Sequence, residues 1–223
     1  MRAAQLSGKT LARAEALSVG DHEVPATGKQ SYDPGAVNTR GYIFIGGGSG
    51  PWRITRISSV IGESLPDATY LDVRTGSIVT LPSGAVWVLK GATSHERYVT
   101  REEKQRLASV QPPLGRAEAT LAALIPVKKS DEWWQLPQDE RRAIFELRSR
   151  HIETGLQYLP AVARRLHHSY DLGEPFDFLT WFEYAPEHAE AFDELVSRLR
   201  ETEEWPYVIR EVDIRVQRAE QPA

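Results

Sequence analysis

The second half of the chain has the more regular pattern of apolar and polar positions, and it predicts the order strand, helix, strand, strand, helix, strand. The expected ranges are 117–127, 137–159, 162–168, 176–183, 186–200 and 207–216. This order is that of a ferredoxin-like unit, an antiparallel sheet with two helices packed on one face. The fold class predicted for the chain is therefore α+β.

Side chains on a strand alternate between its two faces, so the pattern also predicts which residues point inward. Over 162–168, Arg164 shares a face with Val162 and Leu166, whereas Arg165 falls on the other face. The inward positions expected on the later elements are Phe176, Phe178, Thr180, Phe182, Phe192, Leu195, Val196, Leu199, Val212, Ile214 and Val216.

The first half predicts a second, less complete sheet. The expected elements are a strand over 42–45, a turn over 46–50, a strand over 52–60 and a hairpin that joins 77–81 to 85–89. Thr100 and Glu103 fit a capping box, which begins a helix ending near Val110. Two such units side by side would close into a barrel and hide their sheet edges. The division we expect is a flexible extension over 1–40, a reduced unit over 41–115, a ferredoxin-like unit over 116–218 and a tail over 219–223.

Composition narrows the class of protein. The 223 residues are 41% hydrophobic and 26% charged, which is typical of a globular chain, and the net charge of −4 argues against a general nucleic-acid binder. Cysteine is absent, which excludes disulfides, thiolate zinc sites, iron–sulfur clusters and cysteine nucleophiles. We find no run of roughly 20 apolar residues and no secretory signal. The expected location is therefore the cytoplasm, without a membrane partner.

His151 is the most informative single residue. It follows Ile144 and Leu147 at helical spacing, so it lies on the apolar stripe of the predicted helix 137–159. A buried imidazole needs partners for its nitrogens. One interpretation is a core histidine bonded to a carbonyl, and the other is a proximal haem ligand whose far nitrogen a carboxylate holds. Glu204 is a candidate for that carboxylate, although it also fits a solvated acidic run.

Three further features could carry chemistry. Arg164 on an inward strand face fits either a buried salt bridge or a cation placed for a small anion. The adjacent Trp133 and Trp134 fit either the core or a cofactor wall. His167 and His168 point to opposite faces and so do not share one metal ion.

Four segments of the second half resemble the chlorite dismutase family, in its shorter dimeric lineage with a reduced N-terminal half. These segments are EATLAALIPVKKSDEWW, QDERRAIFELRSRHIETGLQYLPAVARRLHH, DLGEPFDFLTWFEYAPEHAEAFDELV and TEEWPYVIREVDIRV. The resemblance implies two ferredoxin-like units that form an α+β barrel of the dimeric α+β barrel superfamily. It implies haem b in the unit over 116–218, no haem in the unit over 41–115, and a homodimer.

The resemblance also implies roles for individual residues. His151 matches the proximal haem ligand, Arg164 the distal arginine, and Glu204 the carboxylate that holds the proximal imidazole. The other matches are Lys129, Trp133 or Trp134, and Tyr98 near the haem propionates, Gln111 on the distal side, and Thr180 and Phe182 in the distal wall.

The implied activity is conversion of chlorite to chloride and dioxygen, through a ferryl haem and a hypochlorite-level fragment held by Arg164. The same fold also occurs in coproheme decarboxylases, which lack an arginine at this position, and a general haem peroxidase is a further alternative. A haem-free binding module, with His151 as a core residue, is the alternative from another class.

Overall fold

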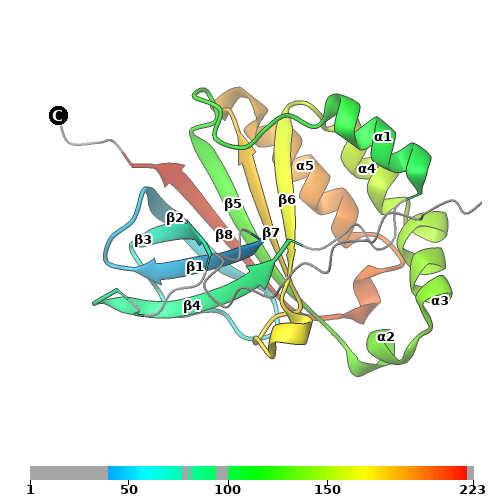
Figure 1. Ribbon diagram of the computed structural model, residues 1–223, viewed down its shortest axis with the longest axis horizontal. Helices are drawn as coiled ribbons and strands as arrows, with labels where there is room; N and C mark the ends of the chain where they lie inside the picture. The colour runs from blue at the N-terminus through cyan, green and yellow to red at the C-terminus, as the bar shows by residue number, and fades with distance from the viewer. Residues whose placement is uncertain (1–39, 77–79, 81, 94–99, 220–223) are drawn as a thin grey trace, which may run out of the picture. The chain divides into compact units, whose positions relative to one another are not determined.

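The computed structural model describes residues 40–76, 80, 82–93 and 100–219, and within these ranges the strands form one closed barrel. The strand order around the barrel is β1-β3-β2-β8-β5-β7-β6-β4, and every pairing is antiparallel. Figure 1 shows the helices beside the strands of the second half. The predicted α+β barrel is confirmed, and no described helix is long and apolar enough to cross a membrane.

The first four strands form one part of the barrel without helices between them in the described residues. They are β1 (Gly41–Gly47), β2 (Trp52–Ile61), β3 (Tyr70–Thr75) and β4 (Ala85–Ala92). Their order, β4-β1-β3-β2, is that of a ferredoxin-like sheet. The chain therefore keeps the strand plan of such a unit while its connections there are short.

Two predictions for this part need correction. β3 was not predicted, and the expected strand over 77–81 lies mostly outside the described residues. Among the described residues, β4 pairs with β1 and touches β6 at Ala92, and the hairpin predicted to join it to 77–81 lies mostly outside them. The turn over 46–50 is shorter than predicted, since Gly46 and Gly47 belong to β1.

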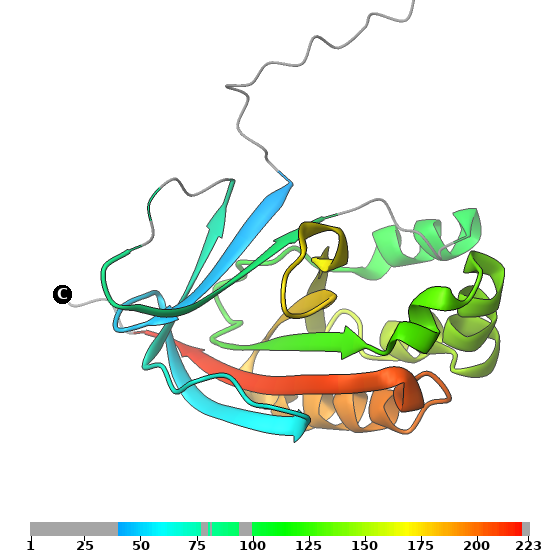
Figure 2. The same ribbon diagram turned by 90° about the horizontal axis from the view of Figure 1, so that it is seen from below.

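The second half follows the predicted order. Its strands are β5 (Leu121–Lys129), β6 (Val162–His168), β7 (Phe178–Tyr184) and β8 (Val208–Arg218), and their order β8-β5-β7-β6 is again ferredoxin-like. β8 also pairs along β2 and so joins the two halves. Figures 1 and 2 show α5 (Ala189–Arg200) alongside this sheet.

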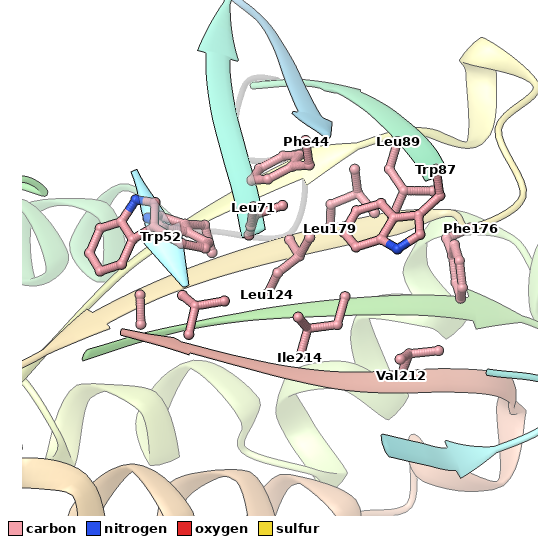
Figure 3. Close-up of a cluster of buried hydrophobic side chains, with 13 residues drawn as sticks. Phe44, Trp52, Leu71, Trp87, Leu89, Leu124, Phe176, Leu179, Val212 and Ile214 are labelled. Carbon is pink, nitrogen blue, oxygen red and sulfur yellow. The ribbon is translucent and has the colours of Figure 1, made fainter. Parts of the chain in front are cut away.

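The barrel interior is filled by apolar side chains from both halves (Figure 3). The buried members of this cluster are Phe44, Trp52, Leu71, Trp87, Leu89, Ala122, Leu124, Phe176, Leu179, Trp181, Val212, Ile214 and Val216. Phe176 was predicted to share a face with Phe178, and this is wrong. It precedes the first residue of β7, so the period of two does not extend to it.

A second apolar layer lies between the outer face of the sheet and α5. Tyr184 of β7 stacks on Phe192 of α5, the tilted ring of Phe182 packs against the same side chain, and Leu195 and Val196 are buried beside them. The inward positions predicted on α5 are confirmed. Alternate residues of β7 thus serve two layers, one inside the barrel and one facing the helices.

The predicted helix over 137–159 is not continuous. It consists of α3 (Gln138–Arg142), a π-helical segment (Ala143–Arg148) and α4 (His151–Gln157), and Arg150 between them has a φ of 50°. This break resets the helical phase, so Leu147 is 74% exposed and does not share an apolar stripe with His151. A short helix, α2 (Asp131–Gln135), was also not predicted, whereas α1 (Arg101–Val110) begins with the expected capping box.

Candidate active site

A cavity of about 400 Å³ is bounded by the outer face of the second sheet and the helices α1, α4 and α5. This volume is in the usual range for a small-molecule or cofactor site. The predicted site residues that line it are Gln111, Lys129, Trp133, His151, Arg164, Thr180, Phe182 and Glu204. Tyr98 lies outside the described residues. Further lining side chains are mostly apolar, among them Ile125, Val127, Phe145, Ile152 and Phe178.

His151 is the first residue of α4, and the segment before it sets its direction. Arg150 adopts the left-handed conformation, which turns the chain between the π-helical segment and α4. The Glu146 carboxylate accepts a hydrogen bond from the backbone N–H of Ile152 at 2.8 Å and so satisfies a free donor at the start of α4. The imidazole also stacks on Phe145, with ring centroids 4.3 Å apart. The turn at Arg150 and the bond to Glu146 therefore fix the start of α4, and Phe145 supports one face of the imidazole ring.

A buried carboxylate connects His151 to a lysine. Nδ1 of His151 lies 3.0 Å from Oε2 of Glu204, and Nζ of Lys129 donates to Oε1 of the same carboxylate at 2.7 Å. Because an ionised carboxylate only accepts hydrogen bonds, Nδ1 of His151 carries a proton, and in the neutral ring Nε2 then keeps its lone pair. That is the tautomer in which Nε2 can bind a metal ion.

The charges around Glu204 keep it ionised. Burial raises the pKa of this carboxyl, but Lys129 and then His151 outweigh that effect and bring the pKa down from 4.5 to about 2. The backbone N–H of Glu204 also donates to Ser149 at 3.1 Å. Glu204 is therefore a fixed anion behind the imidazole.

The two tryptophans of α2 have different surroundings. Trp133 lines the cavity beside Nζ of Lys129, which lies 4.7 Å from its ring, and its buried indole N–H has no partner among the described residues. Trp134 lies outside the cavity lining, donates to Asp177 at 3.0 Å and stacks on Tyr170 at 3.8 Å. Of the two tryptophans, only Trp133 belongs to the cavity wall.

Arg164 contributes a cation to the same cavity, as the period of two in β6 predicts. Burial lowers its pKa, and the charge of Glu146 opposes this. No residue that the structure describes forms an ion pair or a hydrogen bond with its guanidinium. Its backbone carbonyl accepts a hydrogen bond from Nε2 of Gln111 at 3.0 Å, which links β6 to the end of α1. The guanidinium is thus available to an anion that enters the cavity.

Sequence reasoning missed three residues that shape this site. Phe145 stacks on His151, Glu146 caps α4, and Gly155 lies against the guanidinium of Arg164. A carboxylate a few residues before a helix start is a usable signal for Glu146. A glycine inside a predicted helix is a usable signal for a close approach at Gly155.

Comparisons with known proteins show the family of the chain. The family model described as Chlorite dismutase matches residues 79–219, more than half of the chain. The curated chlorite dismutase of Ideonella dechloratans is 31% identical over 129 residues, which cover 55% of this chain and 41% of that protein. The chain therefore spans about two-fifths of the length of this curated relative.

Solved structures extend the likeness to the fold. The dimeric chlorite dismutase from Nitrobacter winogradskyi is 58% identical, with a TM-score of 0.74 over 80% of this chain and 99% of that chain. A chlorite dismutase from Candidatus Nitrospira defluvii in complex with imidazole is 19% identical, with a TM-score of 0.57 over 80% of this chain and 91% of that chain. The second likeness concerns the fold alone.

Proposed function

Because the chain belongs to the chlorite dismutase family, we propose that it converts chlorite to chloride and dioxygen with haem b bound in the cavity that His151 and Arg164 line. The observation that carries this proposal is that one cavity holds both an imidazole whose Nε2 can bind iron and a guanidinium that forms no ion pair or hydrogen bond with a described residue. The first suits an iron ligand and the second suits an anion.

The residues of the cavity fit haem. In the described part of the chain, no group of three or more histidine and carboxylate side chains could hold a bare metal ion. His151 and His168 both line the cavity, and the contact of His151 Nδ1 with Glu204 leaves one imidazole nitrogen of His151 for an iron whose other ligands come from its macrocycle. The cavity wall is largely apolar, which suits the faces of a macrocycle. When bound, the haem supplies the iron centre at which chlorine–oxygen bonds break.

On the ligand side, His151 would hold the iron through Nε2 while Nδ1 donates to Glu204. The carboxylate makes the imidazole a stronger donor, because it draws on the Nδ1 proton. Lys129 balances the charge of Glu204 and keeps it in place. These three side chains would therefore set the strength of the iron–imidazole bond.

On the substrate side, Arg164 would bind chlorite and then retain the chlorine–oxygen fragment until dioxygen forms. A cation in a cavity of low dielectric attracts an anion far more strongly than in water. The overall reaction is balanced by one chlorite ion, since both oxygen atoms leave as O₂ and chlorine leaves as chloride. No further co-reactant is needed, and loss of the fragment is the side reaction that Arg164 would limit.

The unit over 116–218 supplies most of the cavity wall, and Thr93, Leu107 and Gln111 supply the remainder. This supports haem binding in the second unit, with the first unit closing the barrel. We further propose a homodimer, since the similar protein from Nitrobacter winogradskyi is described as dimeric. Light scattering on the purified chain tests this and should give twice the mass of the 25.1 kDa chain.

The function is tested by adding chlorite to purified protein loaded with haem, with an oxygen electrode and a chloride assay. We expect a Soret band on loading, and then one dioxygen and one chloride for each chlorite. If the protein mixed with haem shows no Soret band, it does not bind haem, and the haem-free binding module is the alternative that then holds. Haem uptake with turnover of peroxide and a dye, but without oxygen from chlorite, would indicate a general peroxidase. Coproheme decarboxylation with peroxide would indicate the remaining alternative.

A further inference from the structure

We propose that Gly155 is a positioning residue for Arg164, because its missing side chain leaves the space on α4 in which the guanidinium lies. The two residues belong to different elements, α4 and β6, and they meet at the cavity wall. The catalytic meaning of this contact rests on the proposed function. The contact itself does not require haem.

A side chain at position 155 would meet the guanidinium of Arg164. A Cβ there would lie 2.7 Å from Nη1, 2.9 Å from Cζ and 3.0 Å from Nη2 of Arg164. These atoms are the flat end of a long side chain, which can move away at little cost, whereas α4 cannot. An alanine would therefore displace the guanidinium and leave the fold intact.

The backbone conformation does not explain the glycine. Gly155 lies inside α4 and is not among the described glycines with positive φ. Glycine inside a helix makes folding about fivefold less favourable than alanine does. The space taken by Arg164 is the structural feature that offsets this loss.

The position of Gly155 on α4 gives the contact a consequence for the site. It follows His151 by four residues, so both lie on the same face of the helix, about 6 Å apart along its axis. The helix thus presents the imidazole at its first residue and, one turn later, a bare surface for the guanidinium. Because no described side chain hydrogen-bonds this guanidinium, the available space determines where it lies.

The first test is a double-mutant cycle in the full chain without haem, measured by urea denaturation. In the Arg164→Ala background, Gly155→Ala should raise the folding equilibrium constant about fivefold, as expected for an open helix position. With Arg164 present, that gain should be smaller, because the guanidinium must leave its place. An equal gain in both backgrounds would overturn the contact.

The second test uses azide as the anion and the haem-loaded protein, with the Soret shift as the readout. Gly155→Ala should weaken azide binding about tenfold, since the displaced cation no longer meets the anion. In the Arg164→Ala background the same substitution should have no further effect. The matched control is Gly48→Ala, because nothing lies within 4 Å of a Cβ at that position.

Unchanged or tighter azide binding in Gly155→Ala would overturn the positioning role, as would equal weakening with and without Arg164. These failures are separable from failure of the proposed function. If the protein takes up no haem, the activity proposal fails, and the urea cycle still decides the contact. If haem binds and chlorite yields oxygen, but Gly155→Ala binds azide as tightly as the wild type does, only the positioning role fails.

Discussion

Nδ1 of His151 lies 3.0 Å from Oε2 of Glu204, whose other oxygen accepts a hydrogen bond from Lys129. The three side chains come from α4, from the segment before β8 and from β5, so they are brought together only by the closed second unit. Lys129 and Glu204 are buried, with 4% and 9% of their surface exposed. The relationship therefore ties the proposed iron ligand to the core of the fold.

His151→Ala should lose haem while the apoprotein stays folded, because the ring is partly exposed in the cavity and its removal leaves the sheet packing intact. Haem content per chain, measured as the pyridine haemochrome, is the readout. His188→Ala is the control, since His188 precedes α5 and is absent from the cavity lining. Full haem content in the His151 variant would contradict the ligand assignment.

Glu204→Gln keeps the size of the side chain but removes its charge. It leaves the buried Lys129 without a counter-charge, so we expect a loss of about 3 kcal/mol in the free energy of unfolding at pH 7. The haem-loaded variant should also have a higher reduction potential, since the imidazole donates less strongly. Spectroelectrochemistry and urea denaturation measure the two effects. An unchanged potential would contradict the role given to this carboxylate.

We expect the carboxylate of Glu204 to make the free energy of unfolding fall at acid pH. Its pKa is lowered from 4.5 to about 2, so the folded protein binds this proton less tightly than the unfolded chain does. The stabilisation is complete above pH 4.5, and about 3 kcal/mol of it is lost as the pH falls towards 2. Urea denaturation across this range should show the loss in the wild type and not in Glu204→Gln.

We expect His167 to cause a separate loss of unfolding free energy, which begins at a higher pH. It lies in the barrel interior beside Tyr42 and Phe44, and burial lowers its pKa from 6.5 to about 4, with Arg165 and His168 adding to the effect against a hydrogen bond to Leu179. Stability is therefore full above pH 6.5 and falls by about 3 kcal/mol as the pH drops through 4.

The check on His167 is His167→Gln, which keeps an amide donor for the carbonyl of Leu179 but does not titrate. Its free energy of unfolding should be nearly constant between pH 6.5 and 5, above the range in which Glu204 loses its contribution. A slope equal to that of the wild type would mean that another group titrates there.

Much of the site could be predicted because local patterns determined it. The alternation in β6 put Arg164 and His167 on opposite faces of the strand, and the structure has Arg164 in the cavity wall and His167 beside Phe44. The capping box of α1 was predicted correctly from Thr100 and Glu103. These features depend on residues that are close in sequence, so a period of two or a capping motif is enough to predict them.

Other features depend on tertiary contacts. No glycine marks the left-handed turn at Arg150, so the break before His151 has no local signal, and a continuous helix was the natural prediction. Successive helical residues point about 100° apart, so only one of Trp133 and Trp134 can face the cavity, and their sequence alone does not decide which. β3 does alternate, with Leu71 and Val73 inward, and this signal was overlooked.

The most direct test of the central claim is the amount of dioxygen that the Arg164→Ala variant releases from chlorite, compared with the wild type at equal haem content. We expect the variant to keep its haem, because His151 and Glu204 are untouched, and to release oxygen at least tenfold more slowly or for fewer turnovers. An oxygen yield, rate and lifetime equal to those of the wild type would contradict the claim that this guanidinium holds the anion.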